Sequence, residues 1–378
     1  MAIKKIRNYL QRIGRNRGER QLYIMDRDTG LPRIVIVADD LTGALDSAVA
    51  FASVGRSVAV ARGVGEIDAA LARGLEVLAV NTASREGAEA EAIAAIGAVA
   101  QELPLRDVAT IVKKVDSRLK GHVGAEVREL ARHAGRDRIV GVPAIPGMGR
   151  IQEGGRLTGA GINGAIDLVG RMGGGVEAPD ATTDAALDRI VAREEREPLW
   201  VGARGLTFAI ARARYGSVPP HPDLPGPALF AIGSRDPVTT AQVAALGRAF
   251  EAAPDGAVPV ATAQDWLDVV VMTEGGGGLP AARAGAAFAD GIAARLRERQ
   301  VATLLACGGE TAEAMMDRLG IGCLDVLGEV APGLPVSVAD VPWGRLRIVT
   351  KSGGFGEPDL LGRIVGMVGG QESVGGPL

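Results

Sequence analysis

Two adjacent aspartates follow directly after an apolar run of the sequence. Asp39 and Asp40 come after residues 34–38, which read Ile-Val-Ile-Val-Ala. Carboxylates at the end of a buried strand can accept hydrogen bonds from substrate hydroxyls, hold a hydrated Mg²⁺ ion or deprotonate an attacking alcohol. One of the two could instead cap the helix that the following residues predict. We therefore take Asp39 and Asp40 as catalytic candidates and do not rank one above the other.

A cluster of charged and hydroxyl side chains follows a second β-branched run, at residues 113–122. Cationic donors give short, charge-assisted hydrogen bonds to carboxylates, so the cluster suits an anionic substrate. A solvated charged turn is the alternative interpretation. With an arginine that follows the Pro-Ala-Ile-Pro segment at 143–146, the substrate-binding candidates are Thr42, Lys114, Asp116, Ser117, Arg118, Lys120 and Arg150.

Three polar or glycine-rich turns follow apolar runs in the C-terminal half, at residues 233–242, 308–311 and 351–356. Glycine lets backbone N–H groups approach a ligand closely, and a helix N-terminus adds positive potential. Such turns favour phosphate, so three of them in one half predict a site for a phosphorylated nucleotide. The candidate residues are Gly233, Ser234, Thr239, Gly308, Gly309, Glu310, Thr311, Lys351, Ser352, Gly353, Gly354 and Gly356. The sequence has neither a GxxxxGK[ST] motif nor a GxGxxG after its first apolar run, which argues against a Walker loop and a standard dinucleotide fold.

Short apolar runs alternate with Ala-rich amphipathic segments, which predicts an α/β fold with mainly parallel sheets. Such sheets bind ligands beyond the C-terminal ends of their strands. Strands are expected at 33–38, 57–61, 76–80, 110–114, 138–142, 228–232, 257–261, 301–307, 336–339 and 346–350. Helices are expected at 42–54, 67–73, 87–102, 123–133, 183–195, 237–252, 280–299 and 311–319, with Asp236 as an N-cap. A glycine-rich, loop-like stretch covers 143–182, and the glycines at 275–278 predict a flexible loop.

The composition limits the class of protein. A chain of 378 residues with 47% hydrophobic residues is long enough for two domains. The net charge of 42 − 45 = −3 and the 3% of aromatic residues argue against nucleic-acid binding. Two cysteines without a CxxC pair and three dispersed histidines predict no protein-held metal site, and no apolar run is long enough to span a bilayer.

The predicted domain division is a basic N-terminal extension at 1–32, a first domain at 33–216, a Pro-rich linker at 217–227 and a second domain at 228–378. The extension is either a solvated segment, including one that follows a start codon placed too early, or a helix that contacts a partner or subunit. It lacks the apolar core of a secretory signal, so a cytoplasmic location without a membrane partner is expected.

The motifs taken together resemble the four-carbon acid sugar kinase family. Its A-D-D-x-T-G-A segment matches residues 38–44, its K-x-D-S-T-x-R-G segment is approximated by 114–121, and its P-A-x-P…G-R loop matches 143–150. Its G-S-x-[DS]-x-x-T-x-x-Q, G-G-[DE]-T and K-S-G-x-F-G segments match 233–242, 308–311 and 351–356. The order and spacing agree across residues 33–370. The chain departs from the family pattern at Arg118, where threonine is usual, and at Lys120, where arginine is usual.

The resemblance implies an ATP-dependent kinase that phosphorylates the terminal hydroxyl of a threonate, erythronate or 3-oxo-tetronate. The first domain would hold the acid, the second would hold ATP, Mg²⁺ would accompany its phosphates, and the active site would lie in the inter-domain cleft. Two alternatives stay open: a nucleotide-dependent oxidoreductase or isomerase of sugar acids, and a non-catalytic nucleotide-binding relative. The identity of the acid and the oligomeric state, with a homodimer as one option, are also open.

Overall fold

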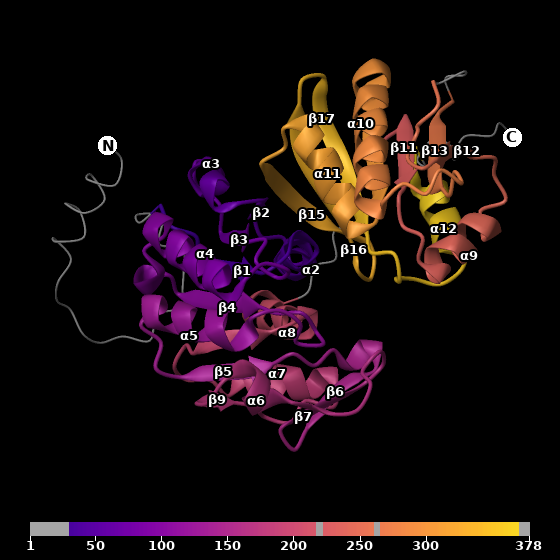
Figure 1. Cartoon of the computed structure of the whole chain (residues 1–378). Coiled ribbons are helices and arrows are strands. Elements are labelled where there is room, and N and C mark those ends of the chain that lie inside the picture. Colours follow the sequence, from indigo (N-terminus) through magenta and orange to yellow (C-terminus); the bar gives the residue numbers. More distant parts are fainter. Residues whose placement is uncertain (1–29, 217–221, 261–264, 370–378) are drawn as a thin grey trace, which may run out of the picture.

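The computed structural model describes residues 30–216, 222–260 and 265–369. Most of the predicted N-terminal extension and part of the predicted Pro-rich linker therefore lie outside the described residues. The described part has two α/β halves (Figure 1). Their strands form one sheet of 14 strands, in the order β12-β13-β11-β14-β17-β16-β15-β2-β3-β1-β4-β10-β5-β9.

The N-terminal half is a parallel sheet flanked by helices. Its central strand β1 (Ile34–Ala38) pairs with β3 and β4 and is buried along its whole length. An entirely apolar strand of this kind is typical of a parallel sheet whose two faces are both covered by helices. Helices α2, α8 and α7 pack in one row, and α4, α5 and α6 pack in another (Figure 1). The remaining elements are β2 (Val58–Ala61), β3 (Val77–Asn81), β4 (Thr110–Lys114), β5 (Ile139–Val142), β9 (Val176–Glu177), β10 (Leu199–Gly202), α2 (Leu41–Ala52), α3 (Ile67–Leu71), α4 (Glu89–Glu102), α5 (Val123–Ala134), α6 (Leu168–Met172), α7 (Asp184–Ala192) and α8 (Arg204–Tyr215).

The C-terminal half combines five parallel strands with an antiparallel hairpin. Strands β12, β13, β11, β14 and β17 run parallel, and β17, β16 and β15 pair antiparallel. Helices α10 and α11 pack together, as do α9 and α12. The elements are β11 (Ala228–Ile232), β12 (Glu251–Pro254), β13 (Leu267–Thr273), β14 (Thr303–Cys307), β15 (Cys323–Ala331), β16 (Leu334–Val341), β17 (Gly344–Lys351), α9 (Pro237–Ala245), α10 (Ala281–Arg299), α11 (Gly309–Leu319) and α12 (Leu360–Met367).

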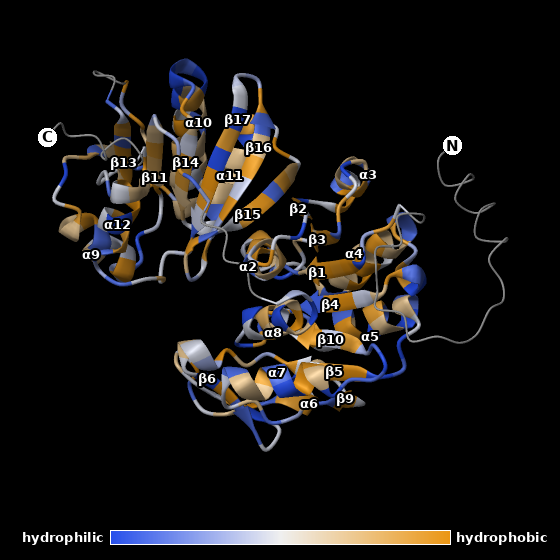
Figure 2. Cartoon of the chain, turned by 180° about the vertical axis from the view of Figure 1, so that it is seen from behind, coloured by the Kyte–Doolittle hydropathy of each residue, from blue (hydrophilic) through white to orange (hydrophobic). Residues whose placement is uncertain are grey.

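The two halves are joined edge to edge. Strand β15 pairs antiparallel with β2, so the hairpin of the C-terminal half continues the sheet of the N-terminal half. Arg62, which follows β2, strengthens the joint by donating to the carbonyl of Ile321 at 2.6 Å and to Asp317 at 2.7 Å. Figure 2 shows that the strands on both sides of the joint are largely hydrophobic. The predicted α/β fold with mainly parallel strands is confirmed, and the described strands of both halves share a single mixed sheet.

The glycine-rich stretch at 143–182 is more ordered than its composition indicates. It forms a small antiparallel sheet from β6 (Arg150–Glu153), β7 (Arg156–Gly159) and β8 (Ile166–Asp167), and it also contains α6 and β9. Gly154 and Gly155 have φ values of 55° and 71° and make the turn between β6 and β7. The prediction of a loop was wrong here because these glycines turn a hairpin instead of loosening the chain.

The elements between residues 246 and 273 also differ from the prediction. Helix α9 ends at Ala245, short of the expected end at residue 252, and residues 251–254 form β12 alongside β13. The strand expected at 257–261 is not formed at 257–260, and residue 261 lies outside the described residues. Asp255 and Gly256 turn the chain with positive φ values, and Pro259 cannot donate a ladder hydrogen bond. Strands β10, β13 and β15 and helices α8 and α12 had no counterpart in the prediction.

None of the described helices has both the length and the apolar character needed to cross a membrane.

Candidate functional site

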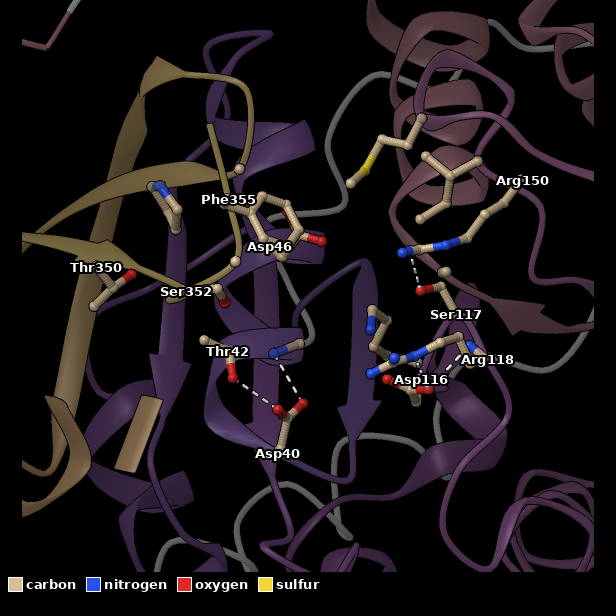
Figure 3. A pocket seen from close by; sticks show the side chains of 18 of the residues that line it. Asp40, Thr42, Asp46, Asp116, Ser117, Arg118, Arg150, Thr350, Ser352 and Phe355 are labelled. Atoms are coloured by element: carbon tan, nitrogen blue, oxygen red, sulfur yellow. Dashed lines mark hydrogen bonds and ion pairs between the residues drawn. The ribbon is translucent and has the colours of Figure 1, made fainter. Parts of the chain in front are cut away.

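Two neighbouring cavities lie between side chains of the two halves. Cavity 1 has a volume of about 430 Å³ and is lined by residues of the N-terminal half, among them Lys114 and Arg150, and by residues of the C-terminal half, among them Gly354 and Phe355 (Figure 3). Cavity 2 has a volume of about 400 Å³ and is lined by Asp39, Gly309 and Gly353, among others. Five residues line both cavities and so mark their junction: Asp40, Thr42, Arg85, Thr350 and Ser352.

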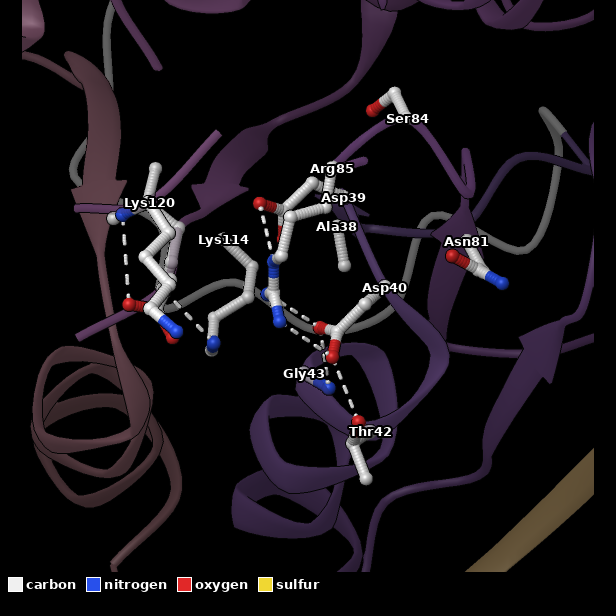
Figure 4. A network of polar contacts seen from close by, with 12 residues as sticks. Ala38, Asp39, Asp40, Thr42, Gly43, Asn81, Ser84, Arg85, Lys114 and Lys120 are labelled. Carbon is white, nitrogen blue, oxygen red and sulfur yellow. Dashed lines mark hydrogen bonds and ion pairs between the residues drawn. The ribbon is translucent and has the colours of Figure 1, made fainter. Parts of the chain in front are cut away.

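An arginine that the sequence analysis missed binds both candidate aspartates (Figure 4). The Nε and Nη2 atoms of Arg85 donate to Asp39 at 3.1 and 2.7 Å, and Nη1 and Nη2 donate to Asp40 at 2.8 and 2.7 Å. Arg85 follows β3, which pairs with β1 in parallel so that Asn81 lies beside Ala38. Parallel neighbouring strands end at the same edge of a sheet, so residues that follow β3 should lie near those that follow β1. This rule could have identified Arg85 from the sequence.

The two aspartates have different surroundings. Asp40 is the N-cap of α2, where Oδ1 accepts from the Gly43 amide at 2.9 Å and Oδ2 accepts from the Thr42 hydroxyl at 2.7 Å. Its side chain is 25% exposed and lines both cavities, whereas that of Asp39 is 1% exposed and lines cavity 2. Burial alone would raise the pKa of Asp39, but hydrogen bonds from Arg85 and the charges of Lys113, Arg85 and Lys114 hold that pKa below its usual value.

A buried ion pair lies behind Asp39. Lys113 Nζ is 3.2 Å from Glu126 Oε2, and both side chains are at most 1% exposed. The Ser84 hydroxyl donates to Glu126 Oε1 at 2.6 Å, and the backbone N–H groups of Ser84 and Arg85 donate to the carbonyl of Asp39. These contacts fix the loop that carries Arg85, so the guanidinium is held in place before any ligand binds.

Besides Arg85, cavity 1 is lined by three cations, Lys114, Arg118 and Arg150, and Figure 3 shows Arg118 and Arg150 close to Asp116 and Ser117. Arg150 donates to the Ser117 hydroxyl at 2.7 Å and to the carbonyl of Ala160 at 2.8 Å. Burial and the nearby charge of Arg118 lower the pKa of Arg150. Arg118 Nε is 4.0 Å from Asp116 Oδ1, which is the outer limit of an ion pair, so its donors are available to a ligand. Asp116 and Ser117 also line the cavity, whereas Lys120 does not.

The three C-terminal turns meet at the ends of β11, β14 and β17. Gly309 and Glu310 open helix α11 and line cavity 2, as does Gly353, while Gly354 lines cavity 1 and Ser352 lines both. The other predicted residues of these turns lie behind the cavity walls. A Cβ atom on Gly233 would lie 2.3 Å from the hydroxyl of Thr311, and one on Gly353 would lie 2.1 Å from that of Ser234. Eight of the predicted site residues line neither cavity: Lys120, Gly233, Ser234, Thr239, Gly308, Thr311, Lys351 and Gly356.

A second arginine without a counterpart in the sequence analysis ties the two halves together beside cavity 1. Arg204, the first residue of α8, donates to Asp46 on α2 at 2.7 Å and to both carboxylate oxygens of Glu329 on β15 at 2.7 and 2.9 Å. Glu329 also accepts from the amide of Gly333, which lines cavity 1. The sequence analysis did not predict β10, the strand before Arg204, so it gave no basis for placing Arg204 near the site.

Comparison with known proteins assigns the chain to a family. A family model for a sugar-binding N-terminal domain matches residues 34–163, and one for a nucleotide-binding C-terminal domain matches residues 255–361. A D-threonate kinase of Bordetella bronchiseptica is 31% identical over a region that covers 88% of this chain and 96% of the relative. A D-threonate kinase of Cupriavidus necator is 30% identical, with 86% and 96% covered.

A solved structure from Salmonella typhimurium LT2 has the same fold. It is 20% identical, with a TM-score of 0.72, and the match covers 88% of this chain and 98% of that one. The fold is thus a two-part α/β architecture with a sugar-binding and a nucleotide-binding domain, and the relatives are sugar-acid kinases. The chain belongs to the four-carbon acid sugar kinase family, which confirms the resemblance drawn from its motifs.

Proposed function

We propose that the protein transfers the γ-phosphoryl group of ATP to the terminal hydroxyl of a four-carbon sugar acid such as threonate, erythronate or a 3-oxo-tetronate. The observation that carries this proposal is the junction of the two cavities. Cavity 1 offers cations that suit a carboxylate, cavity 2 offers glycine turns that suit phosphates, and Asp40, Arg85 and Ser352 stand at the boundary. The active site would thus be the cleft between the two halves.

In this proposal the acid binds in cavity 1. Lys114, Arg118 and Arg150 bind the carboxylate, while Asp116 and Ser117 hold the cations and contact the substrate hydroxyls. Thr42, which lines the junction, contacts the reacting end of the acid. ATP binds with its phosphates against Gly309, Glu310 and the turn at 352–354, and the residues behind these walls support the turns.

The chemical step needs one proton acceptor and a neutralised phosphate. The substrate hydroxyl oxygen bonds to the γ-phosphorus, the bond from that phosphorus to the β–γ bridging oxygen breaks, and ADP leaves with the electron pair. Asp40 receives the hydroxyl proton, because it lines cavity 1 as well as cavity 2 and is the more exposed of the two aspartates. Arg85 stabilises the negative charge that develops on the transferred group.

The carboxylates of cavity 2 fit a magnesium ion that accompanies the nucleotide. Mg²⁺ commonly takes one or two carboxylates together with phosphate oxygens and water. Glu310 and Glu313, both on α11, line cavity 2, and burial raises the pKa of Glu313. These two residues would hold the ion, which when bound supplies neutralisation of the triphosphate charge. Among the described residues, no group of three or more His, Cys, Asp or Glu side chains is arranged to hold a metal.

The predicted linker at 217–227, the cytoplasmic location and the homodimer also stand as proposals. A column calibrated for mass tests the homodimer, because the monomer has a mass of 38.8 kDa.

Coupled release of ADP from Mg·ATP, measured against a panel of four-carbon sugar acids with five- and six-carbon acids as controls, tests the proposed function. We expect turnover with one four-carbon acid and none with the longer acids. If none of the acids in the panel causes release of ADP, while ATP still stabilises the protein against heat, the proposed function is contradicted. That result would favour a non-catalytic nucleotide-binding relative. A change in nicotinamide absorbance with sugar acids would favour the oxidoreductase alternative.

A further inference from the structure

The lysine of the Lys-Ser-Gly-Gly-Phe-Gly segment does not face either cavity. Lys351 is 1% exposed, and its Nζ atom donates to the carbonyls of Ser352 and Gly353 at 3.1 and 3.2 Å and to the hydroxyl of Thr239 at 3.2 Å. Three acceptors around Nζ match the three protons of an ammonium group. Lys351 is therefore fully engaged with Thr239 and with the turn that follows it, and has no donor directed at a phosphate.

Two further side chains bind the same turn from helix α9. The Thr239 hydroxyl donates to the carbonyl of Gly353 at 2.6 Å. The amide of Gln242, one helical turn along, donates to the carbonyls of Phe355, Gly356 and Glu357 at 2.9–3.0 Å. Both side chains are fully buried. Thr239, Gln242 and Lys351 thus hold the carbonyls of this loop on its interior side.

This arrangement determines where the amides of the turn point. In a trans peptide the N–H group points opposite to the carbonyl of the same peptide unit. The carbonyls of Ser352 and Gly353 point at Lys351 in the interior, so the N–H groups of Gly353 and Gly354 point the other way. Gly353 lines cavity 2 and Gly354 lines cavity 1, so the turn stands at the boundary of the cavities with these two N–H groups on the side away from Lys351.

We infer that the turn at 352–354 is an amide cradle for the phosphoryl group in transfer, and that Lys351 and Thr239 are positioning residues that aim it. The inference rests on the proposed function and goes beyond it, because it assigns the contact to backbone amides instead of to the lysine. A phosphoryl group that moves from cavity 2 to cavity 1 has to pass the junction, where Ser352 lies in the wall with Asp40 and Arg85. Preorganised amides there stabilise developing negative charge without reorganising.

The cradle also explains the glycine at 353. A Cβ atom at this position would lie 2.1 Å from Ser234 Oγ and 3.0 Å from the Cβ of Asp236. The turn is thus packed directly against the loop that precedes α9, which leaves no room for a side chain. That contact keeps the turn close to the helix whose Thr239 binds it.

The test uses Thr239→Val, which keeps the volume of the side chain and removes its donor. Dissociation constants for ADP and for a non-hydrolysable ATP analogue are measured by calorimetry with Mg²⁺ present. We expect the analogue to lose about tenfold in affinity, the effect of one hydrogen bond, and ADP to lose little. Lys351→Met, checked for folding by circular dichroism, should show the same selective loss. Thr303→Val is the matched control, because Thr303 is equally buried and donates to the carbonyl of Pro225 away from the cavities.

The outcomes separate the cradle from the proposed function. Equal losses of affinity for ADP and the analogue would overturn the cradle. So would an unchanged affinity in Thr239→Val together with a reduced affinity in Lys351→Met, because that pattern means that the lysine contacts phosphate directly. A wild-type protein that binds the analogue more tightly than ADP in a Thr239-dependent way, but phosphorylates no acid, would keep the cradle and refute the proposed function.

Discussion

Asp40 is a helix cap and a proposed proton acceptor at the same time. Its carboxylate accepts from Gly43, Thr42 and Arg85, so it is held rigidly at the junction of the cavities. We predict that Asp40→Asn lowers kcat by about 10²–10⁴-fold, the usual contribution of a general base, while KM for the acid changes little. Asparagine is also a good N-cap, so α2 should persist. Steady-state kinetics and circular dichroism measure the two effects, and full turnover in a folded Asp40→Asn protein would refute this role.

The ionisation of Asp39 makes the free energy of unfolding depend on pH in the acid range. Its folded pKa lies below that of an unfolded aspartate, about 3.9, so the unfolded chain binds more protons between the two values. The stabilisation is present above about pH 5 and is lost as the pH falls through the folded pKa. We predict that Asp39→Asn is less stable at pH 7 and has a flatter profile of unfolding free energy between pH 5 and 3.

Urea titrations across that pH range check the prediction for Asp39. Asp188→Asn, which removes an exposed partner of Arg212 on the surface, should keep the steep wild-type profile because Asp39 is intact. A profile of equal steepness in wild type and Asp39→Asn would contradict the assignment.

The sequence analysis identified candidate residues that come directly after a predicted strand. It missed residues that lie further along the loop after such a strand. Asp39 and Asp40 stood out because the apolar run before them is unambiguous. Arg85 follows β3 by four positions, and its importance depends on the register that places Asn81 beside Ala38. Lys351 was expected at the nucleotide, yet only the packed structure reveals that its ammonium group is used by its own turn.

At the scale of elements, the hairpin of β15 and β16 is positioned by the ion pair between Arg204 and Glu329. The Arg204 side chain is 12% exposed and that of Glu329 18% exposed, so solvent screens the pair only in part. We predict that Glu329→Gln loses about 1–2 kcal/mol of stability and raises KM for the acid, because the turn at Gly333 forms part of cavity 1. KM for ATP should change less. Glu177→Gln, which breaks an exposed pair with Arg138, is the control and should cost less than about 1 kcal/mol.

The elements that the sequence did not predict are those that tertiary pairing creates. Residues 251–253 read Glu-Ala-Ala, which favours a helix by propensity, yet together with Pro254 they form an edge strand because β13 offers its hydrogen bonds. Strand β15 contains Asp325 and Glu329 and so lacks the apolar pattern of the parallel strands. It forms because β16 on one side and β2 on the other supply partners that are remote in the sequence.

At the scale of the molecule, the continuous sheet makes the two halves one mechanical unit. The register of β15 against β2 pairs Leu324 with Val60 across the joint, and α2 packs on both strands. We predict a single unfolding transition in urea. Trp200 reports on the N-terminal half, Trp266 and Trp343 report on the C-terminal half, and these are the three tryptophans of the chain. Proteins that keep Trp200 alone, or Trp343 alone, should therefore unfold with the same midpoint.

Leu324→Pro sharpens this prediction, because proline removes a hydrogen-bond donor from a central strand and should uncouple the halves. In that background the midpoints reported by Trp200 and Trp343 should separate, and affinity for the acid and the ATP analogue should each fall, since both cavities are built from the two halves. Separate midpoints already in the parent proteins would mean that the joint does not couple the halves. The cavities at their boundary would then have to be assembled by the ligands, and binding of the acid should strengthen binding of the nucleotide by the same factor as the reverse.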